Sequence, residues 1–179
     1  VISASHNPPE FNGIKFFSHD GLKLSDELEN KIEALLLDEG SPAFKPAFPH
    51  LVKKDFSADY EYFLRHTLPR DFSLKGVKLL LDCANGAAYQ IAPRIFKALG
   101  AEIKVIGDKP DGRNINVDCG ALHTAGMAKA AAEWGAFCGI SFDGDADRCM
   151  FADEKGGQMD GDDIVAITAP YLKARGRLT

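Results

Sequence analysis

The sequence has few cysteines, no excess of basic residues and no long apolar run. Its four cysteines form neither a C-x-x-C pair nor a zinc-finger spacing, so they predict neither a common cysteine metal site nor a disulfide framework. Scattered free thiols are typical of a reducing compartment, and we expect a cytoplasmic protein. Lys, Glu or Asp interrupts the longest apolar stretches, which argues against a membrane-spanning helix, and no signal peptide is recognisable.

Acidic residues outnumber basic ones, because 26 Asp and Glu against 21 Lys and Arg give a formal net charge of −5. This balance argues against non-specific binding to nucleic acid and against a polybasic membrane surface. A hydrophobic content of 45% excludes wholesale disorder. At roughly 150 residues per domain, the 179 residues allow one complete domain and a remainder. The chain begins with Val at an apparent strand end, so we expect it to be part of a longer protein.

The apolar pattern predicts an α/β fold. Buried strands alternate with amphipathic helices in the order 77–81 (strand), 87–99 (helix), 102–106 (strand), 123–134 (helix) and 137–142 (strand). This order is typical of a layered α/β/α domain with a mixed, largely parallel sheet. A strand at 149–152 follows too closely for a crossover helix and should pair antiparallel. The flanking expectations are a strand-like 11–17, helices at 26–38, 57–67 and 161–174, and a proline-rich linker at 40–50.

An acidic loop, Asp143-Gly144-Asp145-Ala146-Asp147-Arg148, lies between two of the expected strands. Three carboxylates in five residues repel one another unless a cation lies between them. Oxygen ligands at alternating positions suit a hard divalent ion, and octahedral Mg²⁺ commonly completes its shell with water or phosphate oxygen. The loop therefore predicts a Mg²⁺ site beside a phosphoryl group, with a solvated acidic turn as the plainer alternative.

Two other acidic motifs compete for this loop. An EF-hand does not fit, because its sixth position requires glycine and holds Arg148 here, and its flanks should be helices. Phosphoaspartate phosphatases of the haloacid-dehalogenase type also carry D-x-D after a strand. Their motif continues with a small residue and then Thr or Val, where this chain has Ala146 and Asp147. On the loop alone this alternative stays open.

A second motif, S-A-S-H-N-P at residues 3–8, is followed by N-G-I-K at residues 12–15. Ser5 precedes His6, but adjacency in sequence does not make a nucleophile and base pair. The G-x-S-x-G context of a hydrolase elbow is also missing. By itself the motif is compatible with an ordinary polar turn.

Together the motifs S-A-S-H-N-P, N-G-I-K, D-C-A-N-G-A and D-G-D-A-D-R, in this order, resemble the α-D-phosphohexomutase superfamily. The resemblance covers essentially all 179 residues. The stretches 14–17, 114–116 and 119–123 are more similar to the bacterial branch that acts on glucosamine phosphates than to the phosphomannomutase/phosphoglucomutase branch.

The resemblance implies a position within a four-domain protein. Residues 1–46 correspond to the C-terminal part of domain I with the phosphoserine loop, 47–157 to a complete domain II with the Mg²⁺ loop, and 158–179 to the start of domain III. The sugar-recognition loop of domain III and the phosphate-clamping loop of domain IV are missing. We therefore expect the chain alone to be inactive, with the rest of the parent chain as its partner.

The resemblance also implies a role for single residues. Ser5 corresponds to the phosphorylated serine, and its phosphate joins Asp143, Asp145 and Asp147 as ligands of one Mg²⁺ per active site. The remaining active-site residues would be His6, Lys15 and Arg148. Ala146 departs from the family pattern, which most often has Gly there and so more freedom for a positive φ.

The implied reaction moves a phosphoryl group between the 6- and 1-oxygens of a hexose through phospho-Ser5 and a 1,6-bisphosphate. We expect the phosphosugar substrate to be glucosamine 6-phosphate, converted to glucosamine 1-phosphate. Mannose or glucose phosphates are the alternative. The non-enzymatic alternative is a metal-binding module whose serine is never phosphorylated.

Three of the implied roles have plainer alternatives. Lys15 can take the sugar hydroxyl proton only if Arg148 or Mg²⁺ depresses its pKa, and otherwise it is a structural charge. The alternative for His6 is a residue that only orients its loop. Arg148 could form a salt bridge with the loop aspartates.

Overall fold

The structure is a computed structural model that describes residues 1–38 and 52–178. The predicted linker at 40–50 lies outside the described residues. The elements in chain order are β1 (Ile2–Ser3), η1 (Pro9–Phe11), β2 (Gly13–Ile14), α1 (Asp26–Leu37), α2 (Ser57–His66), β3 (Lys78–Asp82), α3 (Ala88–Ala98), β4 (Glu102–Ile106), α4 (Thr124–Trp134), β5 (Cys138–Phe142), β6 (Cys149–Ala152), β7 (Gln158–Met159) and α5 (Gly161–Ala174).

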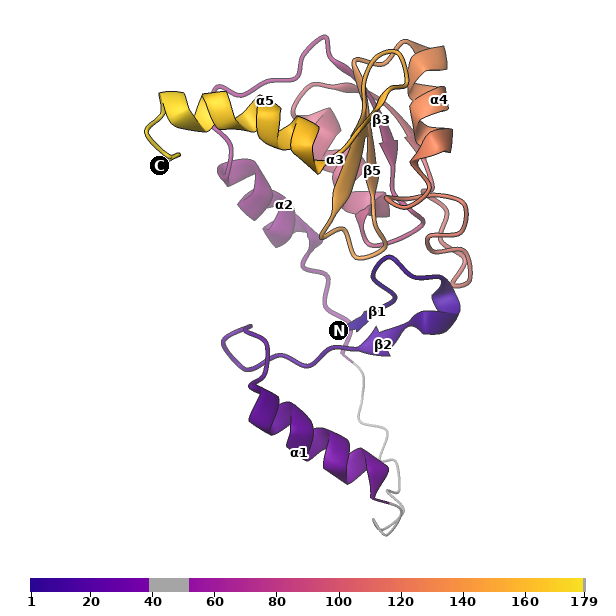
Figure 1. Cartoon of the computed structure of the whole chain (residues 1–179), viewed down its shortest axis with the longest axis vertical. Helices are drawn as coiled ribbons and strands as arrows, with labels where there is room; N and C mark the ends of the chain where they lie inside the picture. The colour runs from indigo at the N-terminus through magenta and orange to yellow at the C-terminus, as the bar shows by residue number, and fades with distance from the viewer. Residues whose placement is uncertain (39–51, 179) are drawn as a thin grey trace.

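The main sheet confirms the predicted α/β class. Its strand order is β4-β3-β5-β6-β7 (Figure 1). Strand β3 pairs in parallel with both β4 and β5, whereas β5 with β6 and β6 with β7 pair antiparallel, as predicted for 149–152. Because β3 and β5 run in the same direction, their carboxyl ends and the loops that follow lie at one edge of the sheet.

The core lies on both faces of β3, because successive side chains of a strand point to opposite faces. Leu79 and Leu81 belong to a cluster that includes Ala92 of α3, and Leu80 belongs to a second cluster with Met127 of α4. Leu80 and Leu81 have no exposed surface, and burial of such a side chain stabilises the fold by about 2 kcal/mol. These two clusters make the layered α/β/α arrangement.

The N-terminal region differs from the prediction. The expected strand at 11–17 is wrong, because Pro9–Phe11 form a 3-10 helix, only Gly13–Ile14 form a strand, and Phe17 makes an isolated bridge with Lys23. Proline at the start of the 3-10 helix fixes φ near the helical value, which favours a turn over a strand. The two extended residues pair antiparallel with β1 in a separate two-stranded sheet, which the sequence did not reveal.

Smaller differences concern helix ends and strand β7. Ser25 precedes α1 as its N-cap residue, and its side chain makes no cap hydrogen bond. Helix α5 is continuous through Pro170, and it begins with the capping box of Asp160 and Asp163. Strand β7 was not predicted and continues the main sheet to Met159. None of the described helices has the length and apolarity needed to cross a membrane.

Candidate active site

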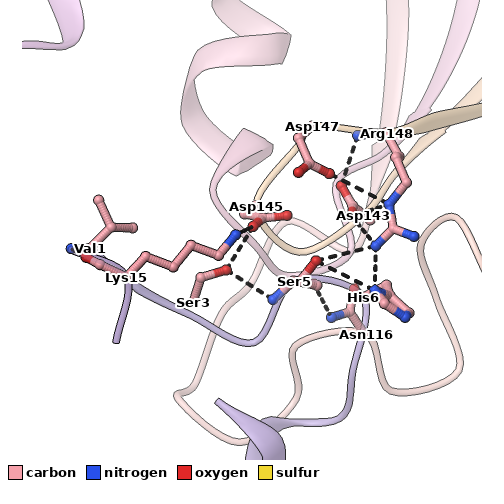
Figure 2. A network of polar contacts seen from close by, with 10 residues as sticks. All are labelled: Val1, Ser3, Ser5, His6, Lys15, Asn116, Asp143, Asp145, Asp147 and Arg148. Carbon is pink, nitrogen blue, oxygen red and sulfur yellow. Dashed lines mark hydrogen bonds and ion pairs between the residues drawn. The ribbon is translucent and has the colours of Figure 1, made fainter. Parts of the chain in front are cut away.

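Two loops that are distant in sequence meet at the carboxyl edge of the main sheet (Figures 1 and 2). The aspartate loop (residues 143–148) joins β5 to β6, and the serine loop (residues 3–8) follows β1. The Ser3 hydroxyl donates to Asp145 Oδ2 at 2.8 Å. The amide N–H of Gly144 donates to the Ser5 carbonyl at 3.0 Å. The contact between the loops therefore involves both side chains and backbone.

The three predicted metal ligands do gather. One carboxylate oxygen from each of Asp143, Asp145 and Asp147 lies within 4.8 Å of the other two. Asp143 is buried, Asp145 is half-buried and Asp147 is exposed. Oδ1 of Asp145 is buried without a hydrogen-bond partner, which is costly for a carboxylate oxygen. Three gathered carboxylates, one of which has an unsatisfied oxygen, are a donor set that fits a hard divalent cation.

Two side-chain cations already contact this triad (Figure 2). Lys15 Nζ lies 2.9 Å from Asp145 Oδ2. Arg148 Nη2 lies 3.1 Å from Asp143 Oδ2, and its Nε lies 3.5 Å from Asp147 Oδ1. The structure thus contains the salt bridge that was the plainer alternative for Arg148, and it screens part of the carboxylate repulsion.

Ser5 lies beside the same arginine. Arg148 Nη2 donates to Ser5 Oγ at 3.2 Å and also contacts Nδ1 of His6. Nδ1 of His6 lies 3.4 Å from Ser5 Oγ. All the predicted site residues are therefore in one cluster.

The backbone at Ser5 is unusual, with φ at +51°. For a residue with a Cβ the left-handed region costs roughly 1–2 kcal/mol, and such strain concentrates at functional sites. The Ser3 hydroxyl supports the turn by accepting the Ser5 amide N–H at 2.9 Å. Ala146 in the aspartate loop is also left-handed, at +60°, which is the conformation that the family's glycine would adopt without strain.

The pKa of Lys15 bears on its possible role as a base. The hydrogen bond from Lys15 to Asp145, together with the charge of Asp145, raises the pKa of the lysine above its ordinary value. The condition under which Lys15 could accept a proton is therefore not met in this arrangement, because Arg148 pairs with Asp143 and Asp147 while Lys15 faces a carboxylate. Burial raises the pKa of Asp145, but the bonds from Lys15 and Ser3 outweigh it and leave the pKa below its ordinary value.

Sequence reasoning missed Asn116, which lies in the segment between β4 and α4. Its side-chain amide donates to the carbonyls of Ser5 and Asn7, each at 2.8 Å. The only signal in the sequence was its place in the stretch 114–116, which pointed to a branch of the superfamily and not to a role. Sequence reasoning also gave Ser3 no role, although it joins Ser5 to Asp145.

Comparison with known proteins decides the family. The family model described as phosphoglucomutase/phosphomannomutase, alpha/beta/alpha domain II, matches residues 61–157, and the corresponding domain I model matches residues 1–42. The chain belongs to the phosphoglucomutase/phosphomannomutase family. The resemblance inferred from the motifs is thereby confirmed.

Relatives within this family share about half of their residues with the chain. A phosphoglucosamine mutase of Geobacter sp. (strain M21) is 50% identical over 99% of the chain, and one of Caldicellulosiruptor bescii is 49% identical over 100% of it. The chain spans 40% of the length of each of these relatives.

Solved structures show the same fold. A phosphoglucomutase/phosphomannomutase family protein from Burkholderia thailandensis is 26% identical, with a TM-score of 0.74 over 98% of this chain and 38% of its own. A putative phosphomannomutase from Thermus thermophilus has a TM-score of 0.79 over 98% of this chain and 40% of its own, at 22% identity.

Proposed function

We propose that this chain is part of a phosphoglucosamine mutase that interconverts glucosamine 6-phosphate and glucosamine 1-phosphate. The observation that carries the proposal is the place of Ser5, whose hydroxyl bonds to the arginine that pairs with Asp143 of the acidic triad. A serine in this position can hold a phosphoryl group between the triad and a substrate hydroxyl. The names of relatives at about 50% identity favour the amino sugar.

The proposal extends to the whole protein. We assign residues 1–46 to domain I, 47–157 to domain II and 158–179 to the start of domain III, and we expect the 179 residues alone to be inactive. The remaining length of the relatives would supply the substrate contacts. We also propose a cytoplasmic location, which the free state of the four cysteines supports.

Asp143, Asp145 and Asp147 would hold one Mg²⁺, with a phosphate oxygen on Ser5 as a further ligand. The unsatisfied Oδ1 of Asp145 supports this assignment. When bound, the ion would withdraw charge from the phosphoryl oxygens and so stabilise Ser5 as the leaving group.

The reaction would consist of two transfers at Ser5. In the first, the bond between phosphorus and Ser5 Oγ breaks while a bond to the free sugar hydroxyl forms, giving a 1,6-bisphosphate. After the sugar has turned, the bond between its original phosphoryl group and the sugar oxygen breaks while a bond from that phosphorus to Ser5 Oγ forms. Phosphoryl transfer depends mainly on positioning and charge stabilisation. Arg148 suits the second task, because it already donates to Ser5 Oγ at 3.2 Å.

In the first transfer a base must accept the proton of the attacking sugar hydroxyl. In the second transfer the Ser5 hydroxyl gives up its proton and the released sugar oxygen takes one. Lys15 is protonated while it is bound to Asp145, since that contact raises its pKa. It can serve as the base only after it leaves this carboxylate. His6 adjoins Ser5 Oγ at 3.4 Å and would orient the serine loop.

A second candidate is a phosphomannomutase/phosphoglucomutase with the same chemistry. The description of the matching family model favours it, as does the relative from Burkholderia thailandensis. The two candidates differ only in the substituent on carbon 2 of the sugar.

The test is a Mg²⁺-dependent mutase assay on the full-length protein with glucosamine, glucose and mannose 6-phosphates. We expect preference for the amino sugar and a loss of kcat of about 10⁴-fold or more in Ser5→Ala, as for other covalent nucleophiles. Ser25→Ala is the control, because Ser25 is exposed and its side chain makes no cap hydrogen bond. Preference for glucose or mannose 6-phosphate would favour the second candidate and reject the amino sugar as substrate. An active Ser5→Ala variant would refute the phosphoserine mechanism.

A further inference from the structure

Asn116 holds the serine loop through its side-chain amide. The residue is 6% exposed, and its side-chain amide donates to two carbonyls of that loop. These carbonyls belong to Ser5 and Asn7, the residues on either side of His6. Figure 2 shows the Asn116 amide directed at the backbone of Ser5.

Asn116 is itself fixed to the main sheet. Its amide N–H donates to the carbonyl of Ala84, just beyond β3, at 2.9 Å. Its φ is +58°, a left-handed value that Asn tolerates better than most residues. Four residues later, the amide of Gly120 donates to the buried carboxylate of Asp82 at 2.7 Å. The asparagine therefore reaches the serine loop from a segment that is anchored to the core.

Two groups converge on the backbone carbonyl of Ser5. The Ser5 carbonyl accepts from both Asn116 Nδ2 and the Gly144 amide. It is therefore bound to Asn116 and to the aspartate loop at once. The fit is close: a Cβ at Gly144 would lie 2.4 Å from the Ser5 carbonyl oxygen and 2.7 Å from Asn116 Nδ2. This leaves rotation about the Ser5 side-chain bond as the main freedom of Oγ.

We propose that Asn116 is a positioning residue for phosphoryl transfer, which fixes Ser5 relative to the aspartate triad without touching the substrate. The proposal rests on the proposed function for its kinetic consequence. A misplacement of about 1 Å in a reacting group can cost about 10²-fold in rate. Loss of the Asn116 amide should therefore reduce kcat and leave sugar binding unchanged.

The decisive variant is Asn116→Asp, which keeps the shape and the tolerance of positive φ but replaces the amide donor by an acceptor facing two carbonyls. Asn116→Gly removes the side chain and also permits the φ, so it tests the same point if the charged variant does not fold. The matched control is Asn114→Asp. Asn114 lies in the same segment, but its amide donates to the Lys109 carbonyl at 2.9 Å and not to the serine loop.

In the full-length protein, we expect Asn116→Asp to lower kcat about 10²-fold with KM within about twofold of the wild type. Asn114→Asp should keep wild-type kcat. A wild-type kcat in both Asn116 variants, or an equal loss in the control, would overturn the proposal. If Ser5→Ala were active, the mutase mechanism would fail instead, and the two failures are thus distinguishable.

Amide hydrogen exchange tests the contact without any assay of activity. The Gly144 N–H bonds across to the serine loop, whereas the Ala146 N–H bonds within the aspartate loop to the Asp143 carbonyl at 3.1 Å. In Asn116→Asp we expect Gly144 to exchange at least about tenfold faster and Ala146 to exchange at its wild-type rate. Equal acceleration at both amides would show a general loss of stability and would contradict a positioning role.

Discussion

The region of residues 1–38 and the layer of residues 78–159 contribute to one site but are built differently. Within the part of the chain that the structure describes, every buried residue except Ala4 lies between Leu79 and Ala152. The layer has two apolar clusters on either side of β3. The N-terminal region has a sheet of two-residue strands, and its helix α1 contains no buried residue.

Because of this difference, the residues of the candidate site are held in place in two different ways. The aspartates and Arg148 follow a strand of the apolar layer, so the core fixes their position. Ser5 and Lys15 belong to the region without a core, and polar contacts join them to the layer (Figure 2). A single hydrogen bond contributes only about 1 kcal/mol net. The alignment of serine and triad therefore depends on several weak contacts acting together.

The largest expected effect is on the free energy of unfolding, and it compares truncation of a buried leucine of the layer with truncation of an exposed leucine of α1. Leu80 is fully buried in the layer, and Leu80→Ala should lower the free energy of unfolding by about 3 kcal/mol. Leu35 of α1 is 68% exposed, and Leu35→Ala should change the free energy of unfolding by less than about 0.5 kcal/mol. Urea denaturation of the 179-residue chain measures both. Similar losses in the two variants would show that α1 packs as tightly as β3.

The second effect concerns backbone strain on the layer side of the site. Because Ala146 has a φ of +60°, Ala146→Gly should raise the free energy of unfolding by up to about 1 kcal/mol. Ala166, exposed in the middle of α5, provides the control. Ala166→Gly should lower the free energy of unfolding by up to about 1 kcal/mol. Thermal and urea unfolding report both changes. A destabilising Ala146→Gly would mean that the loop bears no strain there.

The smallest expected effect is local. It follows from removing the ion pair between Lys15 and Asp145, which joins the two regions. Because the folded pKa of Asp145 is below its ordinary value, the stability from this carboxylate is fully present above about pH 4. It is lost as the pH falls through the lowered folded value. In Lys15→Met the pKa of Asp145 should rise, since burial then opposes ionisation with less compensation.

The side-chain carboxyl carbon shift of Asp145, followed by NMR against pH, measures this change. Lys23→Met is the matched control, because Lys23 pairs with Asp26 and Glu29 of α1 instead. An unchanged titration of Asp145 in Lys15→Met would show that the lysine does not bind it in solution.

The layer could be predicted because its signals are local. The run Leu79–Leu81 reads as a strand buried on both faces, and the aspartates follow one another in a single short loop. The apolar spacing places α3 and α4 within a residue or two of their observed ends. The motif resemblance added Ser5, which spacing alone does not assign.

The junction could not be predicted, because it depends on contacts between distant residues. Asn116 and Ser5 are 111 positions apart, and no periodicity links them. Strands β1, β2 and β7 have two residues each, too short to show alternation. The pairing of Lys15 with Asp145 depends on how the N-terminal region sits against the layer, and so its raised pKa follows only from the assembled site.

The segment between β4 and α4 has no regular secondary structure, yet its length is set at several points. Asn85 accepts the amide of Lys109 at 3.1 Å, Asn116 is tied to Ala84, and Gly120 is tied to Asp82. Surface loops usually tolerate insertions and deletions. Here a one-residue deletion between Lys109 and Asn116 would pull the amide away from the serine loop. Chimeras between relatives should therefore exchange this segment and the serine loop together, at constant length.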